Sequence, residues 1–256
     1  MKVFSLFATL SIAAAASMAA ASVACAYNAD DVSAVTNGQD RPGADLSNAD
    51  LSGADLTGLN LTGANLSNAD LSGARLERAV LTKANFANSN LKRAVFSEAQ
   101  MTEANLRNVE APFSYFGHAI LAHSDLSDGN FFRADFRGAT LTESTGASAV
   151  FQEATFDKAN LSKSDFTFAN FSYSWLFQSN LSESCFTGAN LYEVNGAEIK
   201  AQKADFSSAK LGSARLTGGD FTEAVFEKAV LDKATLKGAV LKDVVWGTAF
   251  KEKAVF

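Results

Sequence analysis

The sequence is poor in the residues that shape loops, disulfides and metal sites. Its 256 residues include two prolines, two cysteines and two histidines. So few prolines indicate a chain with few loops. Cys185 is the one cysteine outside the N-terminal leader described below, so an internal disulfide cannot form. Basic residues do not exceed acidic ones, and the formal net charge of −6 argues against a nucleic-acid ligand.

Long apolar runs are confined to the N-terminus. Lys2 is followed by an apolar, alanine-rich stretch over 3–21 and by the small-x-small site Ala24-Cys25-Ala26. This order predicts a secretory signal peptide over residues 1–26. Two alternatives stay open: an uncleaved membrane anchor, and a lipoprotein-like signal with lipidation at Cys25. We expect export to a periplasm, to a thylakoid lumen or out of the cell, with no membrane attachment after cleavage.

A five-residue repeat occupies the remainder of the chain. Ala44-Asp45-Leu46-Ser47-Asn48 is followed by similar units that begin at Ala49 and Ala54. The large central residue, mostly Leu or Phe, recurs at every fifth position as far as Phe256. The residue two positions earlier is small, mostly Ala or Ser. Neither a helix nor a regular strand has this period, so each unit should be a short extended piece followed by a turn.

These units resemble the pentapeptide-repeat family, whose motif is Ala-Asp/Asn-Leu/Phe-x-x. The resemblance covers 44–256 and implies an all-β fold, a right-handed quadrilateral β-helix with four units in each coil. At ~4.8 Å per coil, about ten to eleven coils would make a rod about 50 Å long. Residues 27–43 are expected to cap the rod with a short α-helix that begins after Asn28 and stops near Gly38.

Four units per coil would stack residues that are twenty positions apart. The central side chains that should lie in file inside the rod include Leu66, Phe86, Phe166 and Phe206. One column of small residues is polar and contains Ser124, Ser144, Ser164 and Ser184. Because a buried hydroxyl needs a partner, we expect these serines to donate to backbone carbonyls.

Several outward positions hold large aromatic residues, although most hold small polar ones. On a four-unit coil the aromatics all fall beside one corner, and exposed aromatics in one place indicate a binding surface. The alternative is that some of them pack back over neighbouring coils. The predicted partner-binding residues are Phe113, Tyr115, Phe132, Tyr173, Trp175 and Tyr192.

The repeat continues to the last residue without a polar capping segment. An apolar coil end can pair with a second copy of itself, so a two-fold homodimer is one expectation. The alternative is a monomer whose last side chains fold over the end. The residues assigned to this end are Val244, Trp246, Phe250 and Phe256.

Catalysis needs groups that converge in a concave pocket, and a filled rod has none. His118 and His123 are outward and five positions apart, which is poor geometry for a shared metal ion. Cys185 is interpreted as an incidental thiol. We therefore expect no enzyme, no metal and no cofactor.

Two functions remain after this exclusion. The favoured one is a structural or protein-interaction module, because the leader and the repeat resemble exported cyanobacterial and thylakoid-lumen members of the family. The alternative, also implied by the family, is a DNA-mimic inhibitor or protector of a type II topoisomerase such as gyrase. The export signal, the modest charge and the lack of loops argue against the alternative.

Overall fold

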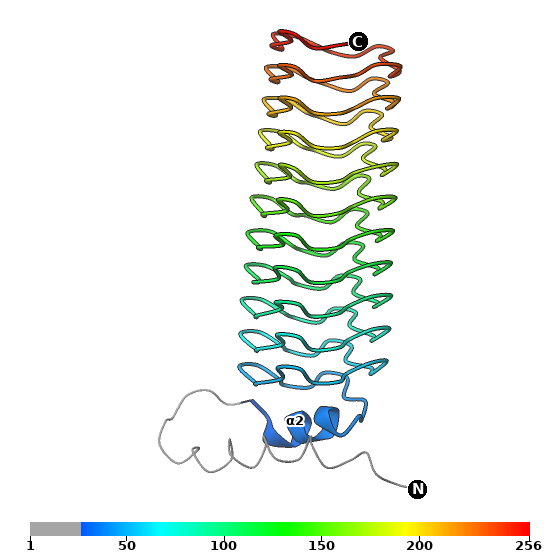
Figure 1. Cartoon of the computed structure of the whole chain (residues 1–256). Coiled ribbons are helices and arrows are strands. Elements are labelled where there is room, and N and C mark those ends of the chain that lie inside the picture. Colours follow the sequence, from blue (N-terminus) through cyan, green and yellow to red (C-terminus); the bar gives the residue numbers. More distant parts are fainter. Residues whose placement is uncertain (1–26) are drawn as a thin grey trace, which may run out of the picture.

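Residues 27–256 are described by a computed structural model, in which a short helix lies at the base of a tall stack of coils (Figure 1). The predicted signal segment, residues 1–26, lies outside the described residues. The coils follow one another in chain order, from the helix at one end to the C-terminus at the other. Within 27–256, no helix has the length and apolar character needed to cross a membrane.

Helix α2 (Ala29–Thr36) closes the N-terminal end of the rod. The Asn28 side chain caps it by accepting a hydrogen bond from the backbone N–H of Asp30 at 3.0 Å. Val35 is fully buried against the first coils. The carboxylate of Asp31 accepts a hydrogen bond from the backbone N–H of Asp45 at 3.0 Å, which satisfies a donor at the open edge of the first coil.

Each coil pairs with the next through parallel bridges of single residues. The residue before each central position bridges to the residue twenty positions later, from Asp45↔Asn65 to Thr235↔Val255. Twenty residues hold four pentapeptides, which is the quadrilateral register that the resemblance implies. Because a turn follows every bridge, no strand in residues 27–256 extends beyond one bridging residue.

The turns place a residue with left-handed backbone two positions after nearly every centre; after Trp246 the left-handed residue is Gly247 instead. Gly53 has φ 65°, but Lys83 and Tyr173 adopt the same conformation with φ 61°. This conformation costs an L-residue roughly 1 kcal/mol or more. The backbone N–H of Gly53 donates to the Ser72 carbonyl of the next coil at 2.8 Å, and this bond recurs along the stack and offsets the cost. The turn side chains point outward and form the surface considered below.

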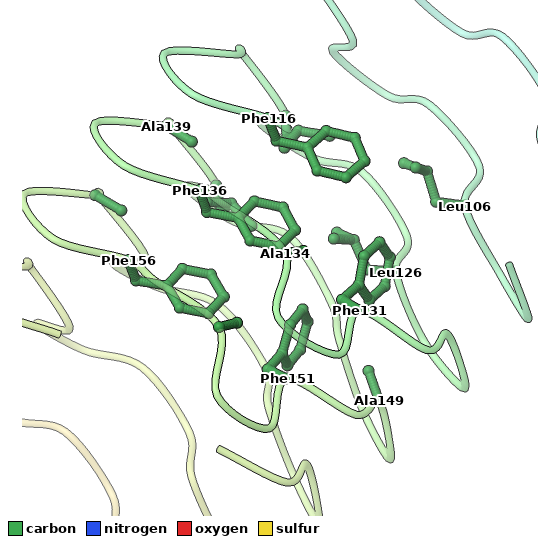
Figure 2. Packing of buried hydrophobic residues seen from close by; sticks show 14 of the residues in the cluster. Leu106, Phe116, Leu126, Phe131, Ala134, Phe136, Ala139, Ala149, Phe151 and Phe156 are labelled. Atoms are coloured by element: carbon green, nitrogen blue, oxygen red, sulfur yellow. The ribbon is translucent and has the colours of Figure 1, made fainter. Parts of the chain in front are cut away.

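The central side chains fill the rod. The four residues expected to lie in file inside the rod are all buried: Leu66, Phe86, Phe166 and Phe206. The rings of Phe116, Phe136 and Phe156 stack face to face, with centroids 4.8 and 4.7 Å apart (Figure 2). The expected files of inward side chains are confirmed.

The serine column bonds to backbone carbonyls, as the sequence predicts. Three hydroxyls donate to the carbonyl three residues earlier, as Ser124 does to Leu121 at 2.6 Å. Ser164 instead donates across coils to the Leu141 carbonyl at 2.6 Å. These bonds let a hydroxyl replace a methyl group in the core without an unpaired polar atom.

Glycine at a central position is accommodated by rings from neighbouring units. A Cβ added to Gly146 would lie 2.8 Å from the Phe166 ring, so the ring occupies the space of the missing side chain. The bridge Thr145↔Asp165 continues past this glycine. Glycine at this central position therefore changes the packing of the core, but no loop leaves the rod there.

Candidate partner-binding site at one corner of the rod

The twenty-residue register brings the predicted surface aromatics beside one corner. Successive bridges link Tyr115 to Trp175 through Asp135 and Thr155, so the four residues form one column. The other four aromatics occupy the two turn positions that precede this column: Phe113, Phe132, Tyr173 and Tyr192. The six residues separate into two groups, which we call the Phe113 cluster (Phe113, Tyr115, Phe132) and the Tyr173 cluster (Tyr173, Trp175, Tyr192).

The Phe113 cluster is partly covered by its own chain. The rings of Phe113 and Phe132 meet edge to face with centroids 5.6 Å apart. The guanidinium of Arg133 lies 5.2 Å from the Phe132 centroid and forms an ion pair with Glu153 at 2.6 Å. Both phenylalanines are half-buried, whereas Tyr115 is exposed. This cluster matches the alternative in which aromatics pack back over neighbouring coils.

The Tyr173 cluster is open to solvent. The rings of Tyr173 and Tyr192 meet edge to face at 5.7 Å. Trp175, on the adjacent face, is 51% exposed and Tyr173 is 44% exposed. Gly212 makes room for the Tyr192 ring, because a Cβ there would lie 3.2 Å from it. Large aromatics held at fixed positions with this much exposure are typical of binding surfaces.

A groove of about 400 Å³ opens beside the Tyr173 cluster, and we call it the Arg215 groove. Its lining residues are Tyr173, Ser174, Trp175, Glu193, Asn195, Ser213 and Arg215. Two columns of side chains form the walls, because residues twenty apart lie on successive coils. From its aromatic end to Arg215 the groove spans two coil steps, roughly 10 Å at the ~4.8 Å spacing.

Five polar groove residues were not among the sequence-predicted site residues: Ser174, Glu193, Asn195, Ser213 and Arg215. Glu193 and Ser213 follow Tyr173 at intervals of twenty, and Asn195 and Arg215 follow Trp175 in the same way. Adding twenty and then forty to the numbers of Tyr173 and Trp175 would have found these four, and Ser174 lies between the two aromatics in the chain. Phe168 was also missed; it is 69% exposed and lies at a turn of the neighbouring corner.

The charge at the groove is mixed. The Glu193 carboxylate, as a hydrogen-bond acceptor and as a negative charge, raises the pKa of the Tyr192 hydroxyl above its ordinary value. The groove carries one carboxylate at its middle and one guanidinium at its far end.

The residues of the predicted dimer end lie at the last coil. Val244 and Trp246 are half-buried, and Phe250 and Phe256 are each about half exposed. The Trp246 ring stacks on Phe226 with centroids 5.1 Å apart. Homodimerisation through this end stays a prediction.

The two histidines are separate from the groove. The ring of His118 packs over Gly138, and Nδ1 of His123 lies 3.6 Å from a Glu143 carboxylate oxygen. Residues 27–256 contain no group of three or more His, Cys, Asp or Glu side chains that could hold a metal ion. Cys185 is half-buried and unpaired, with its sulfur 3.3 Å from the Thr167 hydroxyl.

Parallel coils of four five-residue units around a core of Leu and Phe define the class of quadrilateral β-solenoids. The chain belongs to the pentapeptide repeat family. The family's sequence profile, pentapeptide repeats, matches residues 43–78, 74–109, 113–145, 147–182 and 204–243. This membership implies the right-handed β-helix expected from the resemblance, and family members are typically non-enzymatic structural or interaction modules.

Solved structures of the family resemble this chain. HetL, a pentapeptide repeat protein involved in heterocyst differentiation regulation in the cyanobacterium Nostoc sp. strain PCC 7120, is 27% identical with a TM-score of 0.50; the match covers 78% of this chain and 88% of HetL. Full-length QnrB1, a plasmid-mediated fluoroquinolone resistance protein, is 21% identical with a TM-score of 0.32, over 73% of this chain and 84% of QnrB1. A pentapeptide repeat protein of the Arabidopsis thaliana thylakoid lumen is 20% identical with a TM-score of 0.18, over 52% of this chain and 62% of that protein. No curated protein sequence matches the chain significantly.

Proposed function

We propose that this protein is a non-enzymatic interaction module of an extracytoplasmic compartment, and that it binds a protein partner through the Tyr173 cluster. The observation that carries the proposal is the exposure of three large aromatic side chains beside a groove. Most other outward positions of the repeat hold small or polar residues. Aromatic residues supply a large share of the binding free energy at protein interfaces.

The scaffold suits this role because it holds the cluster rigidly. Helix α2 within residues 27–43 caps one end, and residues 44–256 supply about ten to eleven coils at four units per coil. Backbone bonds fix each turn to the next coil, as the N–H of Tyr173 does by donating to the Tyr192 carbonyl at 2.9 Å. A preorganised surface loses little conformational entropy when a partner binds.

The sequence of residues 1–26 supports the proposed compartment, because a positive charge is followed by an apolar stretch and then by a small-x-small cleavage site. Sequencing the N-terminus of the mature protein tests it. A mature chain that begins close after Ala26 is the expected result. A chain that retains Met1 and resides in the cytoplasm would contradict the proposal.

Partner capture from the native compartment tests the interaction itself. The Tyr173→Ser/Trp175→Ser variant should lose at least about 90% of the captured partner, because both rings leave the surface. Phe168→Ser is the matched control, since it removes an even more exposed ring from the neighbouring corner and should retain the partner.

Unchanged circular dichroism in both variants would show that the rod is intact. Partner retention by the double variant would refute the proposed site. The gyrase alternative is tested in parallel: the purified mature chain should leave DNA supercoiling unchanged, and inhibition of supercoiling would favour the DNA-mimic function.

A further inference from the structure

Arg215 is unusual among the arginines of the rod. All eight arginines lie in the described part of the chain, and six of them form ion pairs with Asp or Glu. Within residues 27–256, the Arg215 guanidinium has no ion-pair partner and no side-chain hydrogen bond. It lines the groove at the end opposite the aromatic rings. A guanidinium with free donors is the side chain best suited to bind a carboxylate.

Asn195 is unusual among the asparagines that occupy bridging positions. Eleven asparagines occupy bridging positions, and in ten of them the side-chain oxygen accepts a hydrogen bond from the backbone N–H two residues later. Asn195 lacks this bond, and its amide has no side-chain partner among residues 27–256. The amide lies between Trp175 and Arg215 on one wall of the groove. A free primary amide can donate to one carbonyl and accept from one N–H, which is the complement of a peptide group.

The order of groups along the groove defines a ligand. Tyr173 and Trp175 offer apolar surface at one end, Glu193 and Asn195 offer hydrogen-bonding groups in the middle, and Arg215 offers a positive charge at the other end. The two ends are roughly 10 Å apart, which is about the span of three residues of an extended polyproline II segment at ~3.1 Å each, and three residues per turn place residues i and i+3 on the same side. We propose that the groove binds an extended segment of the partner protein that carries an apolar side chain and, about three residues away, a carboxylate.

This proposal rests on the proposed function, and it specifies the partner by its chemistry. The apolar side chain packs between the rings of Tyr173 and Trp175. The Asn195 amide pairs with a peptide group of the segment, and the Glu193 carboxylate accepts from a further backbone N–H. The carboxylate reaches Arg215, which lies in residues 191–256, where ten basic residues slightly outnumber nine acidic ones.

Fluorescence of Trp175 offers a direct measurement. The chain has two tryptophans, so a Trp246→Phe background leaves Trp175 as the only one while keeping an aromatic ring stacked on Phe226. The probes are blocked nine-residue peptides with one Leu and one Asp separated by two, three or four positions, together with matched peptides in which Asn replaces Asp. The expected result is a saturable change in Trp175 fluorescence. The tightest binding is expected for the Asp peptide in which Leu and Asp are three positions apart.

Arg215→Gln tests whether Arg215 binds the carboxylate of the peptide. We expect the Asp peptide to bind about ten-fold more tightly than its Asn counterpart, and Arg215→Gln to abolish this preference while leaving the Asn peptide unaffected. Asn195→Ala should weaken the Asp and Asn peptides equally, because it removes a contact to the backbone. The matched control is Arg93→Gln, which removes the other arginine without an ion pair and should change nothing.

Equal binding of Asp and Asn peptides, or an Asp preference that survives Arg215→Gln, would overturn the inference. Binding of an acidic oligosaccharide such as oligogalacturonate, with all peptides inactive, would overturn it as well. The capture experiment with Tyr173→Ser/Trp175→Ser keeps the two proposals distinguishable. If that variant loses the partner but the peptides show no charge preference, the proposed function stands and this inference fails; if the variant keeps the partner, the proposed function fails.

Discussion

Replacing Phe136 by alanine tests whether stacked central rings hold the rod together. Phe136 is fully buried and lies between the parallel rings of Phe116 and Phe156, at 4.8 and 4.7 Å (Figure 2). It also meets Phe131 and Phe151 edge to face at 5.6 and 5.9 Å. One substitution therefore removes four ring contacts and opens a cavity in the middle of the stack.

The magnitude follows from these contacts. A buried Phe→Ala change costs about 3–5 kcal/mol in cores that relax only partly. This range already includes ordinary aromatic contacts, which are worth about 0.5–1.5 kcal/mol each, and the four such contacts of Phe136 place it in the upper part of the range. Neighbouring coils are tied to each other by backbone bonds and cannot collapse far into the cavity. We therefore expect a loss of about 4–5 kcal/mol in the free energy of unfolding.

Equilibrium unfolding of the mature chain in guanidinium chloride, followed by circular dichroism, measures this loss. The control is Phe168→Ala, because the Phe168 ring is 69% exposed and its removal should cost within about 0.5 kcal/mol. A solenoid can unfold in segments, so hydrogen exchange of the coils on both sides of position 136 should accompany the denaturation curve. A loss below about 1 kcal/mol, or equal losses in the two variants, would refute the reasoning.

Two further predictions concern acid and self-association. Hydrogen bonds from Ser47 lower the pKa of the Asp45 carboxyl, and a hydrogen bond and charge from Arg78 lower the pKa of Glu98. A carboxyl whose folded pKa lies below its unfolded value of about 4 stabilises the fold above that value and loses this contribution as pH falls. The denaturation midpoint should therefore stay level from pH 7 to 5 and fall below about pH 4; a rise toward acid pH would contradict the sign. If the last coil pairs two chains, Phe250→Lys with Phe256→Lys should convert a dimer to a monomer in analytical ultracentrifugation, whereas Phe168→Lys should leave the dimer intact. A wild-type chain that sediments as a monomer would eliminate this interface.

The fold was predictable because its rule is local and repeated. Each unit has room for one large and one small inward side chain, so the period of five assigns Leu66 or Phe166 to the interior without any structure. The same rule predicted the serine bonds, because Ser124 and Ser164 stand where other units have alanine and a buried hydroxyl must find a carbonyl. The number of units per coil came from the family resemblance, since a period of five does not state how many turns close a ring.

The candidate site was only partly predictable. Counting in twenties placed Tyr173 and Trp175 beside one corner, together with Phe113 and Phe132. Counting could not show that Arg133 lies across the two phenylalanines while the Tyr173 cluster stays open, because that depends on which side chains reach across coils.

The sequence alone determined that this protein is a filled rod of five-residue units, because a repeating steric pattern fixes which side chains point inward. Tertiary structure decided which part of its surface has unused binding capacity. Asn195 looks like ten other asparagines in the sequence, and Arg215 looks like six paired arginines. The side chains of Asn195 and Arg215 are free because of the residues that lie next to them on adjacent coils and because of their own conformations. The five-residue repeat specifies neither of these.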